Sequence, residues 1–506
     1  MLITLDTSLD KPLYAQIRDQ IRERISNGAL KIGERLEPSR ELAKRLGVHR
    51  TTVSNAYAEL EADGLIQGTV GRGTFVSPLA GEVRRPAVPS RHAHQDVFWQ
   101  SFLAQEQRDD SLGRLMASAL EPGVISFATA HGPDDMTPVE LVRRSADAVL
   151  RRDGATILQY GSSDGYAPLK TYLQARARKD GIPIETDELL ITNGCQQSLD
   201  LIRHSLVAPG DVVVCENPTY PGLWNIFDSS DVRLIGMPVT RDGWDLDYLT
   251  AVLEQNKVKL ILLSPTFHNP TGGTMTLEAR KQLLEIAARY QVPIVEDDIY
   301  GTLRYRGREL PPLKALDTAG LVIYLNSFSK VGFSGLRVGW VAASRRVISR
   351  LRWAKQRADL HTNLPGQAVL EDLGRRGALD KFIRRLRKEY AAKLELCERA
   401  MTKYFPEEAH VARPEGGMAV WVELPPGHDA QALLSRAQER GVIFAPARYF
   451  YFQNARHNAF RLCFTAAKAQ QIEHGVKVLG EVLQEEFRRS LRPKATARAD
   501  AGVALV

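Results

Sequence analysis

A single lysine stands among small and hydroxyl residues in the stretch LNSFSKVGFSGLRVGW, residues 325–340. Lys330 has Ser327 and Ser329 just before it, and Arg337 follows seven positions later. A surface helix would carry several lysines, and a buried strand would carry none. An amine among hydroxyl groups with an arginine nearby is suited to a carbonyl compound that carries phosphate. The stretch therefore predicts a covalent anchor for such a compound.

Other groups that a phosphorylated pyridoxal requires follow apolar runs elsewhere in the chain. The ring needs a carboxylate at its nitrogen, donors at its phenolic oxygen, an aromatic neighbour and a phosphate site at a helix start. The candidates are Cys195 and Gln196 in ITNGCQQSLDLI, Tyr220 in ENPTYPG, Asn269 in SPTFHNPTGG, and Asp297 and Tyr300 in PIVEDDIYG. Because parallel strands bind ligands beyond their carboxyl ends, we expect these motifs to meet at one edge of a sheet.

Each candidate taken alone has a simpler explanation. Asp297 could cap a helix, Tyr220 and Tyr300 could be core aromatics, and Arg461 in FRLCF could be a salt-bridged surface residue. Cys195 is expected to offer its backbone N–H rather than a nucleophilic thiol. The order and spacing of the whole set favour a cofactor site.

The pattern along the chain predicts two folded parts. From about residue 116 to 490, helical segments alternate with short apolar runs such as DVVVCE, KLILLSP and LVIYLNS. This alternation predicts an α/β fold with a mostly parallel sheet covered on both faces. Residues 79–115 are rich in Pro, Ala, Arg and His and are interpreted as a linker, and residues 491–506 as a disordered tail.

The first 78 residues form the other predicted part. Leu13, Ile17, Ile21 and Ile25 recur every four positions and predict the buried face of one helix. ELAKRLGV and RTTVSNAYAELEADG predict two more helices, and LIQGTVGRGTFV predicts a hairpin with a glycine turn. Three helices followed by a hairpin are typical of a winged helix-turn-helix.

Composition limits the classes that fit. The chain has 506 residues, a net charge of +7 and four widely spaced cysteines with no CxxC pair. This is typical of a globular protein of a reducing cytoplasm, without a disulfide framework, and it permits a nucleic-acid partner. No signal peptide or membrane span is expected, and His92 and His94 are interpreted as solvent-exposed residues rather than metal ligands.

Residues 120–485 resemble the fold-type I, class I/II aminotransferases, through the motifs NPTG, EDDIY, SFSKVGFSGLRVG and PEGGMAVWVEL. The resemblance implies pyridoxal 5'-phosphate joined to Lys330 as an aldimine and Asp297 at the pyridine nitrogen. It further implies Asn269 and Tyr300 at the phenolic oxygen and Tyr220 stacked on the ring. The implied phosphate site comprises Cys195, Gln196, Ser327, Ser329 and Arg337, joined by Tyr160 of LQYGSSDGY from the second subunit of a dimer. Arg461 matches the arginine that holds a substrate carboxylate.

The front part resembles the GntR family of winged-helix regulators, through GERL, SRELAKRLGV, RTTV and GRGTFV in that order. The resemblance implies DNA contacts from residues near the recognition helix and from the wing, which are Arg40, Arg50, Thr51, Thr52, Ser54, Gly71, Arg72 and Gly73. Arginine can read guanine edges, and small hydroxyls can donate to phosphate. The chain departs from the family in having His49 before the recognition helix, and Glu37 adds negative charge close to the DNA.

A winged helix joined to an aminotransferase-like domain resembles the MocR subfamily of GntR regulators. The resemblance implies a head-to-tail homodimer, bound to promoter half-sites, that senses a small amine or amino acid through aldimine exchange at Lys330. The cofactor itself could be the effector. Two other hypotheses stay open, a working aminotransferase with an appended DNA-binding domain and a cofactor-free DNA binder. The effector, the operator and the sign of regulation are not predicted.

One further motif is basic, RRGALDKFIRRLRKEY at residues 375–390. Phe382, Leu386 and Tyr390 share one side of a predicted helix. We interpret the stretch as a solvated helix face with these three residues packed inward. The alternative is a supplementary DNA surface.

Overall fold

The computed structural model divides the chain into two compact units, Met1–Arg108 and Asp109–Val506. The residues that the structure describes are 3–6, 11–26, 29–69, 73–77, 111–119, 121–228, 231–241 and 243–490. Each unit has its own hydrophobic core. The predicted linker of residues 79–115 and the predicted tail of residues 491–506 lie mostly or wholly outside the described residues.

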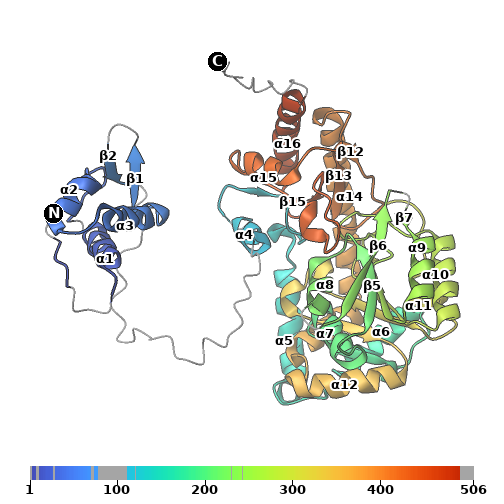
Figure 1. Ribbon diagram of the computed structural model, residues 1–506. Coiled ribbons are helices and arrows are strands. Elements are labelled where there is room, and N and C mark those ends of the chain that lie inside the picture. Colours follow the sequence, from blue (N-terminus) through green and yellow to red (C-terminus); the bar gives the residue numbers. More distant parts are fainter. Residues whose placement is uncertain are drawn as a thin grey trace. The chain divides into compact units, whose positions relative to one another are not determined.

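The first unit has the predicted winged helix-turn-helix layout (Figure 1). Its elements are α1 (Leu13–Ser26), α2 (Ser39–Leu46), α3 (Arg50–Ala62), β1 (Ile66–Thr69) and β2 (Gly73–Val76), with β1 and β2 antiparallel. Ile17, Ile21 and Ile25 are buried as their spacing predicts, whereas Leu13 is half-buried. Helix α2 ends at Gly47, whose φ of 67° lets the chain turn into α3.

The second unit is built on a mixed eight-stranded sheet in the order β4-β11-β10-β9-β8-β5-β6-β7. The pairs β10/β9, β9/β8, β8/β5 and β5/β6 are parallel, while β11 and β7 pair antiparallel with their neighbours. The strands are β4 (Leu189–Thr192), β5 (Val212–Asn217), β6 (Arg233–Thr240), β7 (Gly243–Trp244), β8 (Val258–Leu263), β9 (Ile294–Asp297), β10 (Val322–Ser327) and β11 (Gly339–Ala342). The predicted mostly parallel sheet is confirmed.

Helices cover both faces of this sheet (Figure 1). Val213 and Cys215 of β5 pack toward one face, and Val214 between them packs toward the other. This explains the continuous apolar runs, because a strand covered on both faces packs side chains of both orientations against helices. The first face is covered by α7 (Cys195–Leu206), α8 (Pro221–Asp228) and α12 (Arg345–Asp359), and the second by α9 (Leu246–Gln255), α10 (Leu277–Tyr290) and α11 (Leu313–Leu316).

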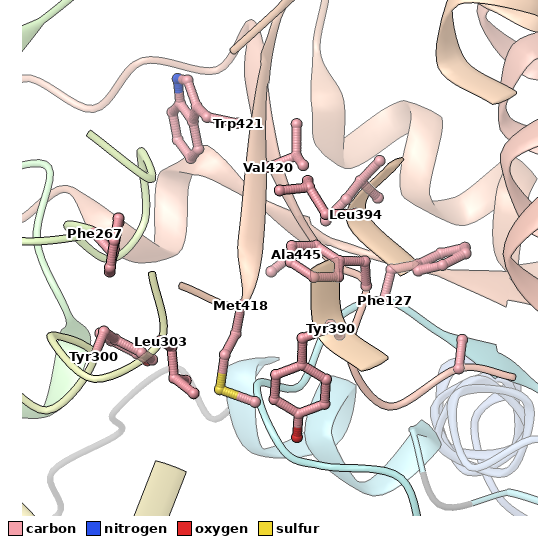
Figure 2. Close-up of a cluster of buried hydrophobic side chains, with 14 of the residues drawn as sticks. Phe127, Phe267, Tyr300, Leu303, Tyr390, Leu394, Met418, Val420, Trp421 and Ala445 are labelled. Atoms are coloured by element: carbon pink, nitrogen blue, oxygen red, sulfur yellow. The ribbon is translucent and has the colours of Figure 1, made fainter. Parts of the chain in front are cut away.

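A second core joins the remaining helices to a four-stranded antiparallel sheet, β12-β13-β16-β15 (Figure 2). Its strands are β12 (His410–Val411), β13 (Ala419–Glu423), β15 (Ala445–Pro446) and β16 (Ala459–Cys463), and β14 (Val442–Ile443) pairs separately with β3 (Ile125–Ser126). The helices are α4 (Ser111–Ser118), α5 (Val139–Ile157), α6 (Ala167–Lys179), α13 (Leu364–Arg375), α14 (Ala378–Tyr404), α15 (Ala430–Gln438) and α16 (Ala469–Ser490). Short 3-10 helices are η3 (Asp134–Met136), η4 (Thr186–Glu188), η5 (Ser329–Val331), η6 (Ser334–Leu336) and η7 (Ala447–Phe450).

Two boundaries differ from the sequence-based expectations. Helix α4 begins inside the stretch interpreted as a linker, because Leu115 is buried in the core of the large unit. The basic stretch of residues 375–390 spans two helices, because Gly377 adopts a φ of 68° between α13 and α14. In α14 the inward packing of Phe382, Leu386 and Tyr390 is confirmed. No helix in the described ranges is long and apolar enough to cross a membrane.

Because the first unit has a core of its own, a cavity placed there should loosen that unit selectively. We expect Ile21→Ala to cost about 2–5 kcal/mol in unfolding free energy of residues 13–76. Hydrogen-exchange mass spectrometry on the full chain would show faster exchange in α1–α3 and unchanged exchange in β8–β10. The exposed Lys44→Ala is the control, and equal acceleration in both units would contradict separate cores.

Candidate cofactor site and nucleic-acid interface

The predicted site residues meet beyond the carboxyl ends of the parallel strands. Gly194 follows β4, Tyr220 follows β5, Asn269 follows β8, Asp297 ends β9 and Lys330 follows β10. Their order in the chain differs from their order in space because the crossover helices bring distant strands together. The sheet edge thus brings into one place residues that are up to 136 positions apart in sequence, from Gly194 to Lys330.

Lys330 lies half-buried in the turn η5. Its Nζ donates a hydrogen bond to the carbonyl of Ala130 at 3.0 Å and lies 5.8 Å from the centre of the Tyr300 ring. The pKa of Lys330 is lowered, chiefly because burial removes water from the ammonium. A lowered pKa increases the neutral fraction of the amine, which is the nucleophilic form.

Asp297 is buried at the end of β9, and its Oδ1 has no hydrogen-bond partner among the described residues. Burial raises the pKa of this carboxyl to about 7, while a backbone hydrogen bond from Ile299 acts in the opposite direction. A buried acceptor without a partner is costly unless a ligand supplies a donor. Asp297 is therefore suited to face a protonated ring nitrogen.

The turn after β4 contacts the loop after β10, and we call the group of phosphate-binding donors gathered there the cup. Helix α7 begins at Cys195 after Gly194, whose φ is 78°, and its first backbone N–H groups lack a side-chain cap. The positive φ of Gly194 favours glycine, and a Cβ there would lie 2.7 Å from Nη2 of Arg337. Ser327 Oγ donates to Ser329 Oγ at 2.9 Å. Helix N–H groups, hydroxyls and a guanidinium are the donors that bind phosphate.

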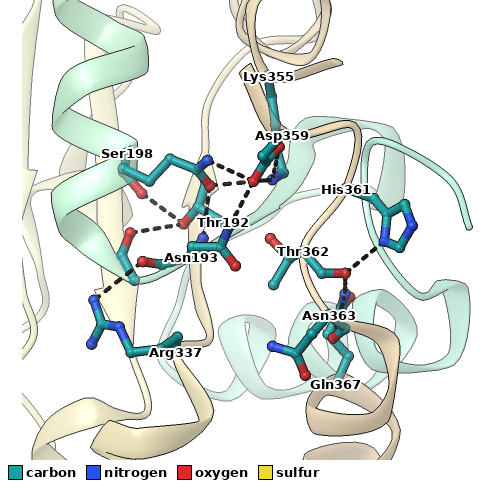
Figure 3. A network of polar contacts seen from close by, with 12 residues as sticks. Thr192, Asn193, Ser198, Arg337, Lys355, Asp359, His361, Thr362, Asn363 and Gln367 are labelled. Atoms are coloured by element: carbon teal, nitrogen blue, oxygen red, sulfur yellow. Dashed lines mark hydrogen bonds and ion pairs between the residues drawn. The ribbon is translucent and has the colours of Figure 1, made fainter. Parts of the chain in front are cut away.

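A network of polar contacts positions the residues that flank the cup (Figure 3). Asp359 accepts hydrogen bonds from Asn193 Nδ2 at 2.6 Å, from Gln197 Nε2 at 2.7 Å and from Lys355 Nζ at 2.6 Å. Arg337 Nη2 also donates to the Asn193 carbonyl at 3.2 Å. The sequence analysis missed Asn193, Gln197, Lys355 and Asp359, and only the i,i+4 spacing of Lys355 and Asp359 could have hinted at a pair.

The remaining cofactor candidates surround the same space. Arg461 of β16 is buried, and its guanidinium donates to Asn269 Oδ1 at 2.7 Å and to the Ala128 carbonyl at 2.5 Å. The Nε of Arg461 has no partner among the described residues. Tyr300 is buried, whereas Tyr220 is exposed and lies against Gln196 and Gly222. The segment carrying Ala128 and Ala130 was not predicted to reach the site.

Tyr160 differs from the other candidates, because its side chain is 84% exposed. Its ring makes an edge contact with His361, at 6.0 Å between ring centres. Cys195, Cys215, Cys397 and Cys463 are all free thiols, and burial raises the pKa of each. The described residues include no group of three or more potential metal ligands.

The DNA-contact candidates occupy the start of α2, the start of α3 and the hairpin. Arg40 and Arg50 are exposed, as is Thr51, and Thr52 and Ser54 are half-buried. His49 caps α3, with its Nδ1 accepting the Thr51 N–H at 3.4 Å and lying 2.8 Å from the Thr51 hydroxyl. Glu37 forms an ion pair with Arg45 at 2.8 Å, which compensates its negative charge.

At the hairpin, Gly73 has a φ of 116°. A Cβ added there would lie 2.8 Å from Nε of Arg35, so glycine is required at the root of the wing. The sequence analysis missed Arg35, which packs at this position. Gly71 and Arg72 lie outside the described residues.

The fold and the site together define a class. The unpartnered oxygen of Asp297, the amine of Lys330 and the cup at Gly194 fit a phosphorylated pyridoxal. A mixed sheet with this site at its carboxyl edge defines a fold-type I pyridoxal-phosphate protein, here in one chain with a winged-helix unit.

The chain belongs to the family of aminotransferases of class I and II, whose model matches residues 124–479, and residues 13–76 match the bacterial regulatory proteins of the gntR family. Members of the aminotransferase family use pyridoxal 5'-phosphate. With both parts in one chain, the protein is a MocR-type regulator, and its gntR unit implies DNA binding.

Relatives of two kinds resemble the chain. An uncharacterized HTH-type transcriptional regulator, YdcR of Escherichia coli, is 31% identical over 94% of this chain and 99% of its own length. The probable rhizopine catabolism regulatory protein MocR of Rhizobium meliloti is 27% identical, over 94% and 95%. Aromatic-amino-acid aminotransferase 1 of Thermococcus litoralis is 37% identical, over 72% and 89%.

Solved structures resemble the large unit. The multiple substrate aminotransferase of Thermococcus profundus has a TM-score of 0.73 and 35% identity, covering 78% of this chain and all of its own. LysN, the alpha-aminoadipate aminotransferase of Thermus thermophilus, has a TM-score of 0.72 and 34% identity over the same shares.

The ion pair between Lys355 and Asp359 should stabilise the folded protein measurably, because the Lys355 side chain is wholly buried. Removing one partner of a buried pair leaves the other charge uncompensated. We expect Asp359→Asn to lower the free energy of unfolding by about 3 kcal/mol, and the double variant with Lys355→Met to recover part of it. Urea unfolding followed by tryptophan fluorescence measures both.

The matched control has the same i,i+4 spacing on the surface. Asp147 pairs with Arg151 in α5, with both side chains exposed. Asp147→Asn should cost less than about 0.5 kcal/mol. Losses of equal size at Asp359 and Asp147 would show that the network does not contribute to stability.

The raised pKa of Asp297 predicts a pH dependence in cofactor-stripped protein. Between about pH 4 and 7 the unfolded carboxyl releases its proton while the folded one keeps it, so stability falls as pH rises through 7. The side chain of Asp297→Asn cannot titrate. Its free energy of unfolding should therefore rise relative to that of the wild type by up to about 4 kcal/mol as the pH increases across this range. Melting temperatures from pH 4 to 8 test this, and parallel curves for both proteins would contradict it.

Proposed function

We propose that this MocR-type regulator binds promoter half-sites as a dimer and changes its DNA binding when a small primary amine or amino acid reaches the site of Lys330. The observation that supports the proposal is the complete set of cofactor-binding groups in the same chain as a winged helix. The cofactor itself remains the alternative effector. Regulation requires only that the two ligand states favour different arrangements of the protein.

Pyridoxal phosphate, when bound, supplies an aldehyde with which a primary amine can condense and a ring that withdraws electrons. In our proposal the partly dehydrated amine of Lys330 holds this group covalently, and Asp297 accepts the ring N–H. Tyr220 offers its exposed ring for stacking, and Asn269 and Tyr300 face the phenolic oxygen.

The cup binds the phosphate in this proposal. Backbone N–H groups of Cys195 and Gln196 lie at the start of α7, and Ser327, Ser329 and Arg337 supply hydroxyls and positive charge. The network at Asp359 keeps the cup in place without the ligand, so little ordering is required on binding.

Arg461 is the proposed anchor for a carboxylate of the effector. Its Nη1 is bound to Asn269 and its Nε has no described partner. An effector carboxylate would compete with Asn269 for this guanidinium, so effector binding and the position of Asn269 are linked. A carboxylate held by two guanidinium nitrogens is bound more strongly than one held by a single donor.

The proposed dimer is head to tail, with each winged helix across the large unit of the partner. Proteins of this fold dimerise, and the 84% exposure of Tyr160 is consistent with a role in a second subunit's phosphate site.

A second candidate function is transamination. The pairing of Arg461 with Asn269, and the presence of Lys330 and Asp297 at the same edge of the sheet, support this candidate. Steady product formation from an amino acid and a keto acid would favour this function over sensing.

The test is a DNA footprint on the promoter regions beside the protein's own gene. Cofactor-loaded and cofactor-stripped full chains would be compared with Lys330→Ala, and with Lys281→Ala, an exposed lysine of α10, as control. We expect paired protected half-sites that change with cofactor in the wild type and the control but not in Lys330→Ala.

Each other outcome has a distinct meaning. Specific protection that ignores both cofactor and Lys330→Ala would show a cofactor-independent DNA binder. The absence of specific protection in every state would overturn the regulator proposal and favour an enzyme.

A further inference from the structure

The large unit has a second cavity, of about 530 Å³, which adjoins the cup and shares Ser327 with it. It lies between α6, the first turns of α14 and residues 301–312. Its volume is within the range of pockets that hold small organic ligands. None of the functions proposed above uses it.

The cavity combines an apolar wall with a polar base. The wall is formed by side chains from α6, α14, β11 and the loops after α6 and β10, namely Leu173, Ile182, Phe328, Val331, Trp340 and Ile383. At the base, Asp298 accepts the Tyr324 hydroxyl at 2.9 Å, and Tyr324 in turn accepts from Asn326 at 2.6 Å. The base is therefore internally satisfied, and the wall can receive a ring or a branched chain.

Five cationic side chains line the cavity, and three of them, including Arg304, form ion pairs within the chain. Arg176 is paired with Asp380 at 3.0 Å, and Arg387 lies 3.2 Å from Glu309. Lys179 and Arg384 are exposed and have no ion pair or hydrogen bond within the described part of the chain. They therefore leave positive charge at the rim, opposed there by the carboxylate of Asp180.

Arg304 is the fifth of these cations, and it is only 5% exposed. Its Nη1 pairs with Glu415, its guanidinium lies 4.8 Å from the centre of the Phe267 ring, and its Nη2 has no partner among the described residues. A buried guanidinium nitrogen without an acceptor is costly in a protein interior. Arg304 lines the cavity, so an anion bound there would lie close to its guanidinium.

We propose that this cavity is a second ligand site, which binds a small organic carboxylate with an aromatic ring or a branched aliphatic chain. The apolar body packs against Phe328, Val331 and Trp340. The carboxylate is bound by Arg304, with Lys179 and Arg384 adding positive charge at the rim. The basic stretch that begins α14 thus lines a small-molecule site.

The two sites share their walls. Asp297 belongs to the cofactor site, and the next residue, Asp298, lines the cavity. Likewise, Lys330 belongs to the cofactor site, and the next residue, Val331, lines the cavity. Asn326 links the base of the cavity to the cup, because its Oδ1 accepts the backbone N–H of Ser327 at 2.7 Å. A ligand in the cavity therefore changes the affinity of the cofactor site, and the reverse holds equally.

The probe is 3-phenylpropionate, which has a ring and a carboxylate but no amine or carbonyl that could react at Lys330. Isothermal titration calorimetry would use the cofactor-loaded full chain, both as wild type and as Arg461→Ala, which removes the carboxylate anchor of the cofactor site. We expect Arg461→Ala to retain one binding site per chain.

The decisive comparison uses two neighbouring exposed arginines of α14 in the Arg461→Ala chain. Arg384 lines the cavity and Arg385 does not. Arg384→Glu should weaken binding about tenfold, because the charge beside the carboxylate is reversed, whereas Arg385→Glu should change it less than about twofold. The same titrations in the wild-type background keep the comparison valid if Arg461→Ala fails to fold, with Arg384→Glu then affecting one of two sites.

Three outcomes would overturn the proposal. The first is the absence of binding apart from the site of Arg461, and the second is an equal effect of Arg384→Glu and Arg385→Glu. The third is loss of DNA affinity in Arg384→Glu without any effect on the organic acid, which would make the start of α14 a DNA surface. None of these outcomes depends on whether the footprint at the promoter responds to the cofactor.

Discussion

The structure depends on keeping ionisable groups away from water at one edge of a sheet. Asp297 is buried with an oxygen that has no partner among the described residues, and the pKa of the nearby Lys330 is lowered. Dehydrated charges are unfavourable unless opposite charges or donors surround them. The residues around them supply part of that compensation. The acceptor and donors that are left without partners are complementary to a protonated ring nitrogen and a phosphate.

The parts of the structure that the sequence predicted are those determined by local patterns of residues. The motif residues stand at strand ends, and a strand end is recognisable where a short apolar run gives way to polar residues or to proline, as at Asp297 and Asn269. The cup residues were predictable for this reason, and the buried face of α1 was predictable from the four-residue spacing of Ile17, Ile21 and Ile25. Local patterns report local structure.

The contacts that hold these motifs are not local. Asp359 reaches Asn193 across 166 positions, and Arg461 reaches Asn269 across 192. No periodicity marks such pairs, because they exist only once the sheet and its crossovers are formed. The start of α4 escaped prediction similarly, since its composition suggests a linker and only burial of Leu115 in a distant core makes it part of the large unit.

Helix α14 connects two distant parts of the large unit. It runs without a break from Ala378 to Tyr404, which corresponds to a rod about 40 Å long. Its first turns border the cavity, and its last turns pack against α16, where the Tyr404 backbone would touch a Cβ at Gly480. Gly377 separates α14 from α13 at one end, and the Tyr404 backbone packs closely against α16 at the other. One continuous helix thus connects the cavity with the core that contains the C-terminal sheet.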